Sequence, residues 1–172
     1  TKVTGERLAM NYWKQYGVDV RGIRYPGLIS YKAPAGGGTT DYAVDIFHAA
    51  LEKGHYDCFV RADTRLPMMY MDDAIRATID LMDAPLESIG ESRGGYNLSG
   101  CSFSASQIAD AIAARVPGFT CDFKPDVRQE YADSWPNSVD DSAARQDWGW
   151  NAEYDLGALC DAMISGLQSS SI

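Results

Sequence analysis

The stretch VDVRGIRYPGLISYKAPAGGGTT, residues 18–40, decides how the rest of the chain is arranged. Its first six residues are rich in β-branched side chains, which predicts a buried strand over 18–23 that leads into Tyr25-Pro26-Gly27. A second short apolar run and three consecutive glycines follow, before a helix that we expect from about Asp41 to Lys53. We therefore expect the mouth of a ligand site in this stretch.

The segment before this stretch predicts a helix over residues 1–16, ended by Gly17. A helix, a glycine and a β-branched strand form one step of a parallel α/β sheet. Because ligands bind beyond the carboxyl ends of such strands, the sequence indicates a binding position at Tyr25, Pro26, Gly27 and Leu28. A plain turn at these residues is the alternative.

The glycine triplet 36–38 allows close approach of the backbone to a ligand, and free amides at a helix start suit an anion. Thr39 or Thr40 is the expected N-cap of the helix that follows. A phosphate-binding P-loop is excluded, because no Gly-Lys-Ser/Thr follows. A carboxylate fits as well as a phosphate, and a flexible loop with an ordinary cap remains an equal alternative.

Further along, helices and strands continue to alternate. A helix is expected from about 72 to 82, with Ile75, Ile79 and Met82 facing inward and Asp72 or Asp73 as its N-cap. Ser104 and Gln107 have the spacing of a capping box. Trp135 precedes Pro136 and cannot lie inside a helix, so it is either a core anchor or the lid of a pocket.

Composition sets limits on the class of protein. A chain of 172 residues with 45% hydrophobic residues fits one globular domain. The net charge of −9 argues against a nucleic-acid partner, and no apolar run approaches the ~20 residues that a membrane span needs. The four scattered cysteines are expected to be reduced thiols of an intracellular protein, and His55 is expected to be a solvated turn residue. The sequence therefore predicts no metal site.

The chain lacks an initiator methionine and a signal pattern, and Thr1 reads as mid-helix, so we expect part of a longer protein.

Five segments together resemble the short-chain L-threonine 3-dehydrogenases. They are TKVTGE (1–6), RYPGLIS (24–30), PAGGGTTDYAVDIF (34–47), LPMMYMDDAIRATIDLM (66–82) and ADSWPNSVDDSAARQDWGW (132–150). These enzymes belong to the extended short-chain dehydrogenase/reductases, near the sugar-nucleotide epimerases. The likeness runs from Thr1 to about Ala162 and implies the second half of such a protein.

The resemblance implies a fold and a division of the chain. The expected fold is the C-terminal part of a Rossmann-type parallel sheet with a small mixed α/β substrate-binding region. Residues 1–172 would form a single unit, with substrate-binding segments at roughly 31–70 and 101–150. The glycine-rich dinucleotide loop and the catalytic tyrosine would lie upstream, the tyrosine four residues before Lys2.

The resemblance also implies the site. Lys2 would be the lysine of the family's Y-x-x-x-K motif, which lowers the pKa of the catalytic tyrosine and holds the nicotinamide ribose. Tyr25, Pro26, Gly27 and Leu28 would line the nicotinamide of NAD. Gly38, Thr39 and Thr40 would bind the substrate carboxylate, and Trp135 would close over the substrate.

The implied reaction is the NAD-dependent oxidation of L-threonine to 2-amino-3-ketobutyrate. One alternative is a sugar-nucleotide epimerase or dehydratase, with Arg61 and Arg65 serving a diphosphate. Another is a noncatalytic fragment that only packs against a partner chain. The resemblance further implies a homodimer through the helix ending near Tyr16, and a mitochondrial compartment in eukaryotes or a cytoplasmic one in bacteria.

Overall fold

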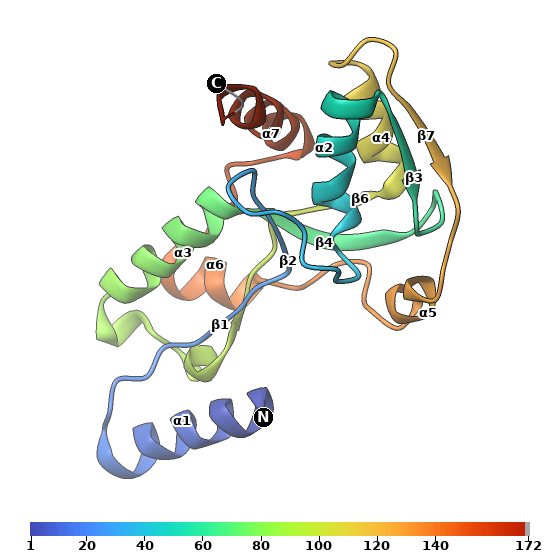
Figure 1. The fold of residues 1–172 in the computed structure, drawn as a ribbon. Coiled ribbons are helices and arrows are strands. Elements are labelled where there is room, and N and C mark those ends of the chain that lie inside the picture. The colour runs from blue at the N-terminus through green and yellow to red at the C-terminus, as the bar shows by residue number, and fades with distance from the viewer. Residues whose placement is uncertain (171–172) are drawn as a thin grey trace.

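The computed structural model describes residues 1–170 and shows a mixed α/β fold (Figure 1). The helices are α1 (Lys2–Tyr16), α2 (Tyr42–Lys53), α3 (Met71–Asp83), α4 (Ala105–Ala113), α5 (Arg128–Asp133), α6 (Ser142–Trp148) and α7 (Leu156–Ser170), with 3-10 turns η1 (Leu86–Ser88) and η2 (Glu91–Gly94). The strands are β1 (Ile23–Arg24), β2 (Gly27–Ile29), β3 (His55–Cys58), β4 (Arg65–Tyr70), β5 (Tyr96–Asn97), β6 (Cys101–Ser104) and β7 (Thr120–Phe123).

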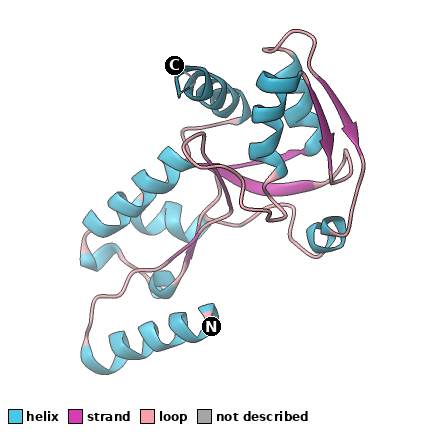
Figure 2. Ribbon diagram, viewed as in Figure 1, coloured by secondary structure: helices cyan, strands magenta, loops and turns pink. Residues whose placement is uncertain are grey.

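The strands form three small sheets (Figure 2). β1 pairs in parallel with β5, and β3 pairs in parallel with β7. The third sheet has the order β2-β4-β6, with β2 parallel and β6 antiparallel to β4. Three of the four pairings are therefore parallel, as the alternation of helices and strands predicts.

Two apolar cores lie on either side of β4. The larger core joins the strands of the second and third sheets to α2, α4 and α7, which contact one another. The smaller core joins α3 and β5 to the segment around Trp150. The predicted division into substrate-binding segments stays a prediction, since the two cores share a continuous chain.

Several residues of the segment 132–150 stabilise the smaller core and the chain beside it. The Asp141 carboxylate accepts hydrogen bonds from the Trp150 indole (3.1 Å) and from the Ser99 amide (3.3 Å). The Asp147 carboxylate accepts one from the Tyr96 hydroxyl (2.6 Å). These aspartates and the tryptophan therefore hold β5 and its exit loop in place.

α1 begins and ends as the sequence predicts, with Gly17 in the left-handed conformation at φ 68°. Its attachment to the rest of the chain is polar and aromatic. The Arg93 guanidinium lies 3.4 Å above the Trp13 ring, and Glu6 pairs with Arg24. Leu8, Tyr12 and Tyr16 remain exposed, so the apolar face of α1 has no cover in the described chain.

The strand expected to start at Val18 is shorter than predicted, because β1 comprises only Ile23 and Arg24. The side chain of Arg21 explains the difference, because it pairs with Asp19 and donates to the carbonyls of Leu81 (2.6 Å) and Ala84 (2.7 Å). The segment is thus tied to the end of α3 instead of to a neighbouring strand. Gly27 and Leu28, expected beyond the carboxyl end of the predicted strand or in a plain turn, belong to the next strand, β2.

The residue that caps α2 differs from the prediction, although the bounds of the helix agree with it. Asp41 is the N-cap, and neither Thr39 nor Thr40 caps the helix. The Asp41 carboxylate folds back on the glycine triplet and accepts a hydrogen bond from the Gly38 amide (2.7 Å). The predicted capping box at α4 is confirmed, since Ser104 and Gln107 exchange both of its hydrogen bonds.

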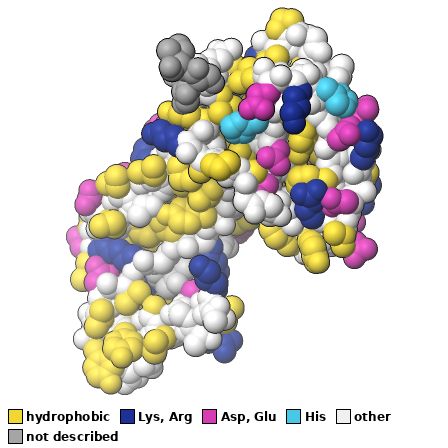
Figure 3. All heavy atoms as spheres, in the orientation of Figure 1, with side chains coloured by type: hydrophobic (Ala, Val, Ile, Leu, Met, Phe, Trp, Pro, Cys, Tyr) yellow, Lys and Arg dark blue, Asp and Glu magenta, His cyan; other side chains and the backbone are white. Residues whose placement is uncertain are grey.

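α3 buries the opposite face from the one predicted. Ile75, Ile79 and Met82 are 52%, 53% and 69% exposed. The buried residues of α3 are Asp73, Ala74, Ala77 and Leu81, and only Leu81 among them has a large apolar side chain. Alanines allow the helix to approach the smaller core closely, which leaves the larger apolar side chains outside (Figure 3).

Asp73 holds α3 to the segment before α7, instead of capping its own helix as predicted. Its side chain is 1% exposed and accepts hydrogen bonds from the Glu153 and Tyr154 amides, each at 3.1 Å. Arg76 completes the group with a 2.6 Å ion pair. Each carboxylate oxygen is therefore satisfied in a buried place.

Replacing Asp73 by alanine should lower the free energy of unfolding by about 3 kcal/mol, because it leaves two part-buried amides and a guanidinium without their acceptor. Urea denaturation followed by circular dichroism measures this loss. The exposed neighbour Asp72 provides the control, and Asp72→Ala should cost less than about 1 kcal/mol. Equal losses in the two variants would contradict the role given to Asp73.

Candidate active site

A cavity of about 380 Å³ lies where β2, the start of α2 and the segment after α5 meet. It brings together Tyr25, Pro26, Gly27 and Leu28 with Thr40 and Trp135, which are far apart in the sequence. Pro67, Pro136 and Val139 complete its lining. Six of the residues selected from the sequence thus share one cavity.

Gly27 makes the floor of this cavity possible. A Cβ atom on Gly27 would lie 2.5 Å from the Met68 sulfur and 2.8 Å from the Thr40 methyl carbon. Gly27 pairs with Met68 in the sheet, so β2 and β4 fix this approach. The glycine therefore allows the Thr40 side chain to lie directly against the strand.

The Tyr25 side chain is anchored to α3. Its hydroxyl is hydrogen-bonded to the Thr78 hydroxyl, which in turn donates to the Ala74 carbonyl at 2.7 Å. Since Thr78 uses its hydrogen on Ala74, Tyr25 is the donor to Thr78. The phenol ring is thereby fixed at the wall of the cavity with its hydroxyl already satisfied.

Trp135 lies at the mouth of the cavity with its side chain partly exposed. Its amide donates to the Ala132 carbonyl (3.1 Å), which continues the last turn of α5. The neighbouring Asn137 carbonyl accepts from the Ser102 hydroxyl at 2.7 Å and ties this segment to β6. The arrangement favours the lid over the core anchor, the two alternatives that the sequence left open.

The cavity is electrically neutral. Among the described residues that line it, only Tyr25 carries an ionisable group. Prolines, a phenol and an indole give flat apolar walls, and the Thr40 hydroxyl supplies a hydrogen-bonding group. Such a lining suits an uncharged planar ring beside a small polar ligand.

Three predicted site residues lie elsewhere. Gly38 and Thr39 are outside the cavity lining, and the Gly38 amide already donates to Asp41. Lys2 is exposed and borders a separate hollow with Arg21, between α1 and the segment before β1. The described chain therefore does not bring Lys2 to the cavity.

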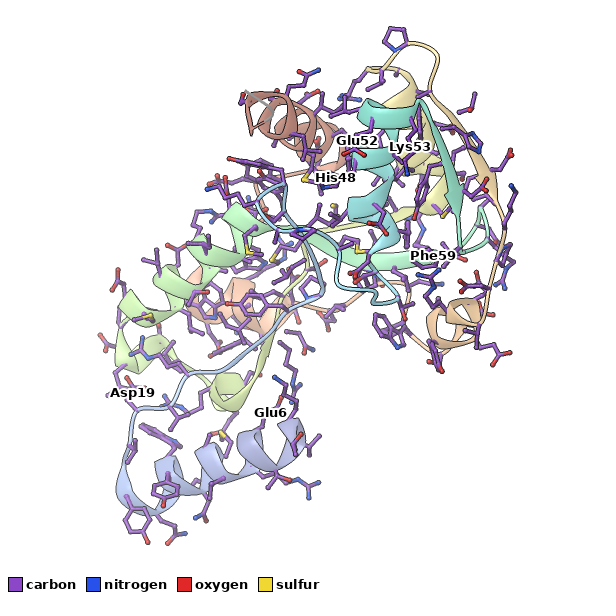
Figure 4. All side chains as sticks on the ribbon, in the orientation of Figure 1. Glu6, Asp19, His48, Glu52, Lys53 and Phe59 are labelled. Carbon is purple, nitrogen blue, oxygen red and sulfur yellow. The ribbon has the colours of Figure 1, made fainter. Side chains whose placement is uncertain are left out.

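A larger hollow of about 680 Å³ was not predicted from the sequence. It lies between α1 and η2, with Glu6 on the side of α1 that faces the rest of the chain (Figure 4). The hydrogen bond from the Arg24 guanidinium lowers the pKa of the Glu6 carboxyl. Arg7 and Lys14 also line this hollow, so it carries more positive charge than the cavity at Tyr25.

The chain was compared with known proteins. No family model matches it. It is 47% identical over 166 residues to the mitochondrial L-threonine 3-dehydrogenase of Bos taurus, covering 96% of this chain and 44% of that protein.

Two solved structures have the same fold. The GalE-like L-threonine dehydrogenase from Cupriavidus necator (apo form) is 56% identical with a TM-score of 0.92, over 96% of this chain and 60% of that one. A monomeric L-threonine 3-dehydrogenase from a metagenome is 53% identical with a TM-score of 0.92, over 99% and 55%. The chain thus spans about half the length of the relatives it matches.

Replacing Gly27 by alanine should push Thr40 and Met68 away from β2 and destabilise the chain by about 1–3 kcal/mol, the usual effect of overpacking. Thermal unfolding measures this change. Gly5→Ala is the matched control, because a Cβ there meets nothing within 4 Å and alanine favours the helix. An unchanged melting temperature for Gly27→Ala would show that the strand tolerates the added methyl group.

Proposed function

We propose that the chain is the C-terminal half of an NAD-dependent L-threonine 3-dehydrogenase of the extended short-chain dehydrogenase/reductases, in line with its similarity to named L-threonine dehydrogenases. The observation that carries this proposal is the neutral cavity in which Tyr25 to Leu28 meet Thr40 and Trp135. The sequence identity of about half to two named threonine dehydrogenases supports it.

The residues present fit the nicotinamide end of NAD. The flat walls at Tyr25, Pro26 and Leu28 suit the planar nicotinamide ring, and Gly27 leaves room at the floor of the cavity. NAD, when bound, supplies the acceptor for the hydride that leaves the β-carbon of threonine. Lys2 lies outside this cavity in the described chain, so its role requires the complete enzyme, in which it would hold the nicotinamide ribose and keep the pKa of the upstream tyrosine low, so that this tyrosine can accept the hydroxyl proton.

The substrate would lie between Thr40 and Trp135. Thr40 lines the cavity, and its hydroxyl would donate a hydrogen bond to the threonine carboxylate. Trp135 would cover the substrate and exclude water. Binding through the Gly38 amide requires the Asp41 carboxylate to give way, since it accepts that N–H in the described chain.

The side chains favour threonine over a sugar nucleotide. A diphosphate needs free basic groups, yet Arg61 is paired with Asp133 at 2.7 Å. Arg65 donates to the Ser102 carbonyl (2.5 Å) and to Gln107 (2.8 Å). Both arginines proposed for the epimerase alternative are therefore engaged in holding the fold.

The exposed apolar surface of α3 agrees with the proposal that this chain is half of an enzyme. The exposed apolar stripe Ile75, Ile79 and Met82 of α3 contains Thr78, the residue that anchors Tyr25. We propose that the remaining half of the enzyme covers this stripe and completes the site. We place the homodimer contact at the exposed aromatic residues Tyr12 and Tyr16 of α1, although one relative is named as monomeric.

The decisive experiment joins this chain to the part of the Cupriavidus necator enzyme that it does not match. The chimera should form NADH with L-threonine and show no reaction with a panel of UDP-sugars, and this chain alone should bind no NAD. In the chimera, Lys2→Met should lower kcat by roughly two orders of magnitude or more, while the exposed Lys14→Met serves as control. A folded chimera that converts a UDP-sugar but not threonine would overturn the proposal.

In the same chimera, Thr40→Ala should raise the KM for threonine roughly tenfold or more, because it removes a hydrogen bond to a charged carboxylate. The affinity for NAD should barely change. Thr40→Ser keeps the hydroxyl and should retain most of the substrate affinity. Steady-state kinetics and NAD titration separate the two effects, and a variant that loses NAD affinity while keeping its KM for threonine would assign Thr40 to the cofactor instead.

A further inference from the structure

The pairing of β3 with β7 gathers a mixed group of polar side chains on one exposed face. His55 lies opposite Thr120, and Asp57 lies opposite Asp122 in the parallel register. Because side chains alternate along a strand, these four residues point to the same side. The intervening residues Tyr56, Cys58, Cys121 and Phe123 point to the larger core. Figure 1 shows the two strands side by side at the outer edge of the molecule.

Three donor atoms on this face lie at distances that suit a metal ion. The His55 Nε2 atom is 3.0 Å from Asp57 Oδ1 and 4.0 Å from Asp122 Oδ2. The donor atoms of all three residues lie within 4.8 Å of one another. Ligands bound at about 2.0–2.2 Å to one metal stand roughly 3.0–3.5 Å apart, so small side-chain rotations close the site.

The imidazole is already oriented for ligation. The His55 Nδ1 atom is 2.8 Å from the Thr120 hydroxyl oxygen. Without an ion, Nε2–H donates to Asp57 Oδ1 at 3.0 Å; an ion would take the place of this proton, and Nδ1–H could then donate to Thr120. Histidine ligands in metal sites are held in the same way by a hydrogen bond from their second ring nitrogen.

The charges around the group also favour an added cation. Two carboxylates in directly opposite positions of neighbouring strands repel each other. Lys124 neutralises only part of this charge, through a 2.8 Å contact with Asp57 Oδ2, and leaves Asp57 Oδ1 toward His55.

We propose that His55, Asp57 and Asp122 bind a divalent transition-metal ion such as Zn²⁺ or Co²⁺, independently of the proposed dehydrogenase site. One imidazole and two carboxylates suit these ions better than Mg²⁺, which prefers oxygen ligands alone. All three side chains are exposed, so water completes the coordination shell. Among residues 1–170, this is the group of His, Cys, Asp and Glu side chains that meets this distance criterion.

The test is a Co²⁺ titration of this chain followed by NMR of the two histidine rings. The His55 resonances should shift in a saturable manner at one equivalent of ion. His48 on α2 lines the same hollow as His55 and Asp57, so its resonances can shift through space, and the His55→Asn variant is the reference (Figure 4). Absence of a saturable shift at His55, or shifts at His48 that persist unchanged in His55→Asn, would overturn the proposal.

Calorimetric titration with ZnCl₂ provides the second measurement. His55→Asn and Asp122→Asn should each weaken binding at least tenfold, whereas Asp83→Asn removes an exposed carboxylate elsewhere and should leave it unchanged. Circular dichroism confirms that the variants fold. If Asp122→Asn binds Zn²⁺ as tightly as Asp83→Asn, the ion lies elsewhere, for example on the cysteine thiols, and the assignment is wrong.

Discussion

The arrangement of the whole chain depends on the pairing of β4, a buried strand with a neighbour on each side. Its alternation sends Leu66 and Met68 into the larger core and Met69 into the smaller one. Pairing with β2 begins at Met68, one residue after Pro67, whose nitrogen has no hydrogen to donate. Pro67 lines the cavity at this point, so the end of the ladder and the opening of the site coincide.

The cavity and the exposed apolar face of α3 are structurally connected. Contacts within this chain position the side chains that line the cavity. Thr40 packs against Gly27, and the Tyr25 hydroxyl is hydrogen-bonded to the Thr78 hydroxyl. The next residues of the same α3 face, Ile75 and Ile79, have no cover. A half-length chain can therefore shape a pocket wall while leaving an apolar surface that an isolated soluble domain would normally bury.

Buried and partly buried carboxylates stabilise the fold of this protein, whereas the residues that line the cavity carry no charge. Asp73, Asp141 and Asp147 each accept hydrogen bonds from groups distant in the sequence and hold short segments together. These segments are too short to be fixed by backbone ladders alone, since β1 and β5 have two residues each. The aspartates of the motif in 132–150 thus explain the fold of that segment, and they lie outside the cavity lining.

The sequence by itself determined the α/β class, the bounds of α1 and α2, the capping box of α4 and six residues of the cavity. These features depend on local signals, such as Gly17 after a helical pattern, or on a resemblance that carries residue identities. Only the tertiary structure decided which face of α3 is buried, because Ala74 and Ala77 allow close packing that periodicity alone does not reveal. It also decided that His55 meets Asp122, since strand register joins residues whose spacing along the chain gives no sign of contact.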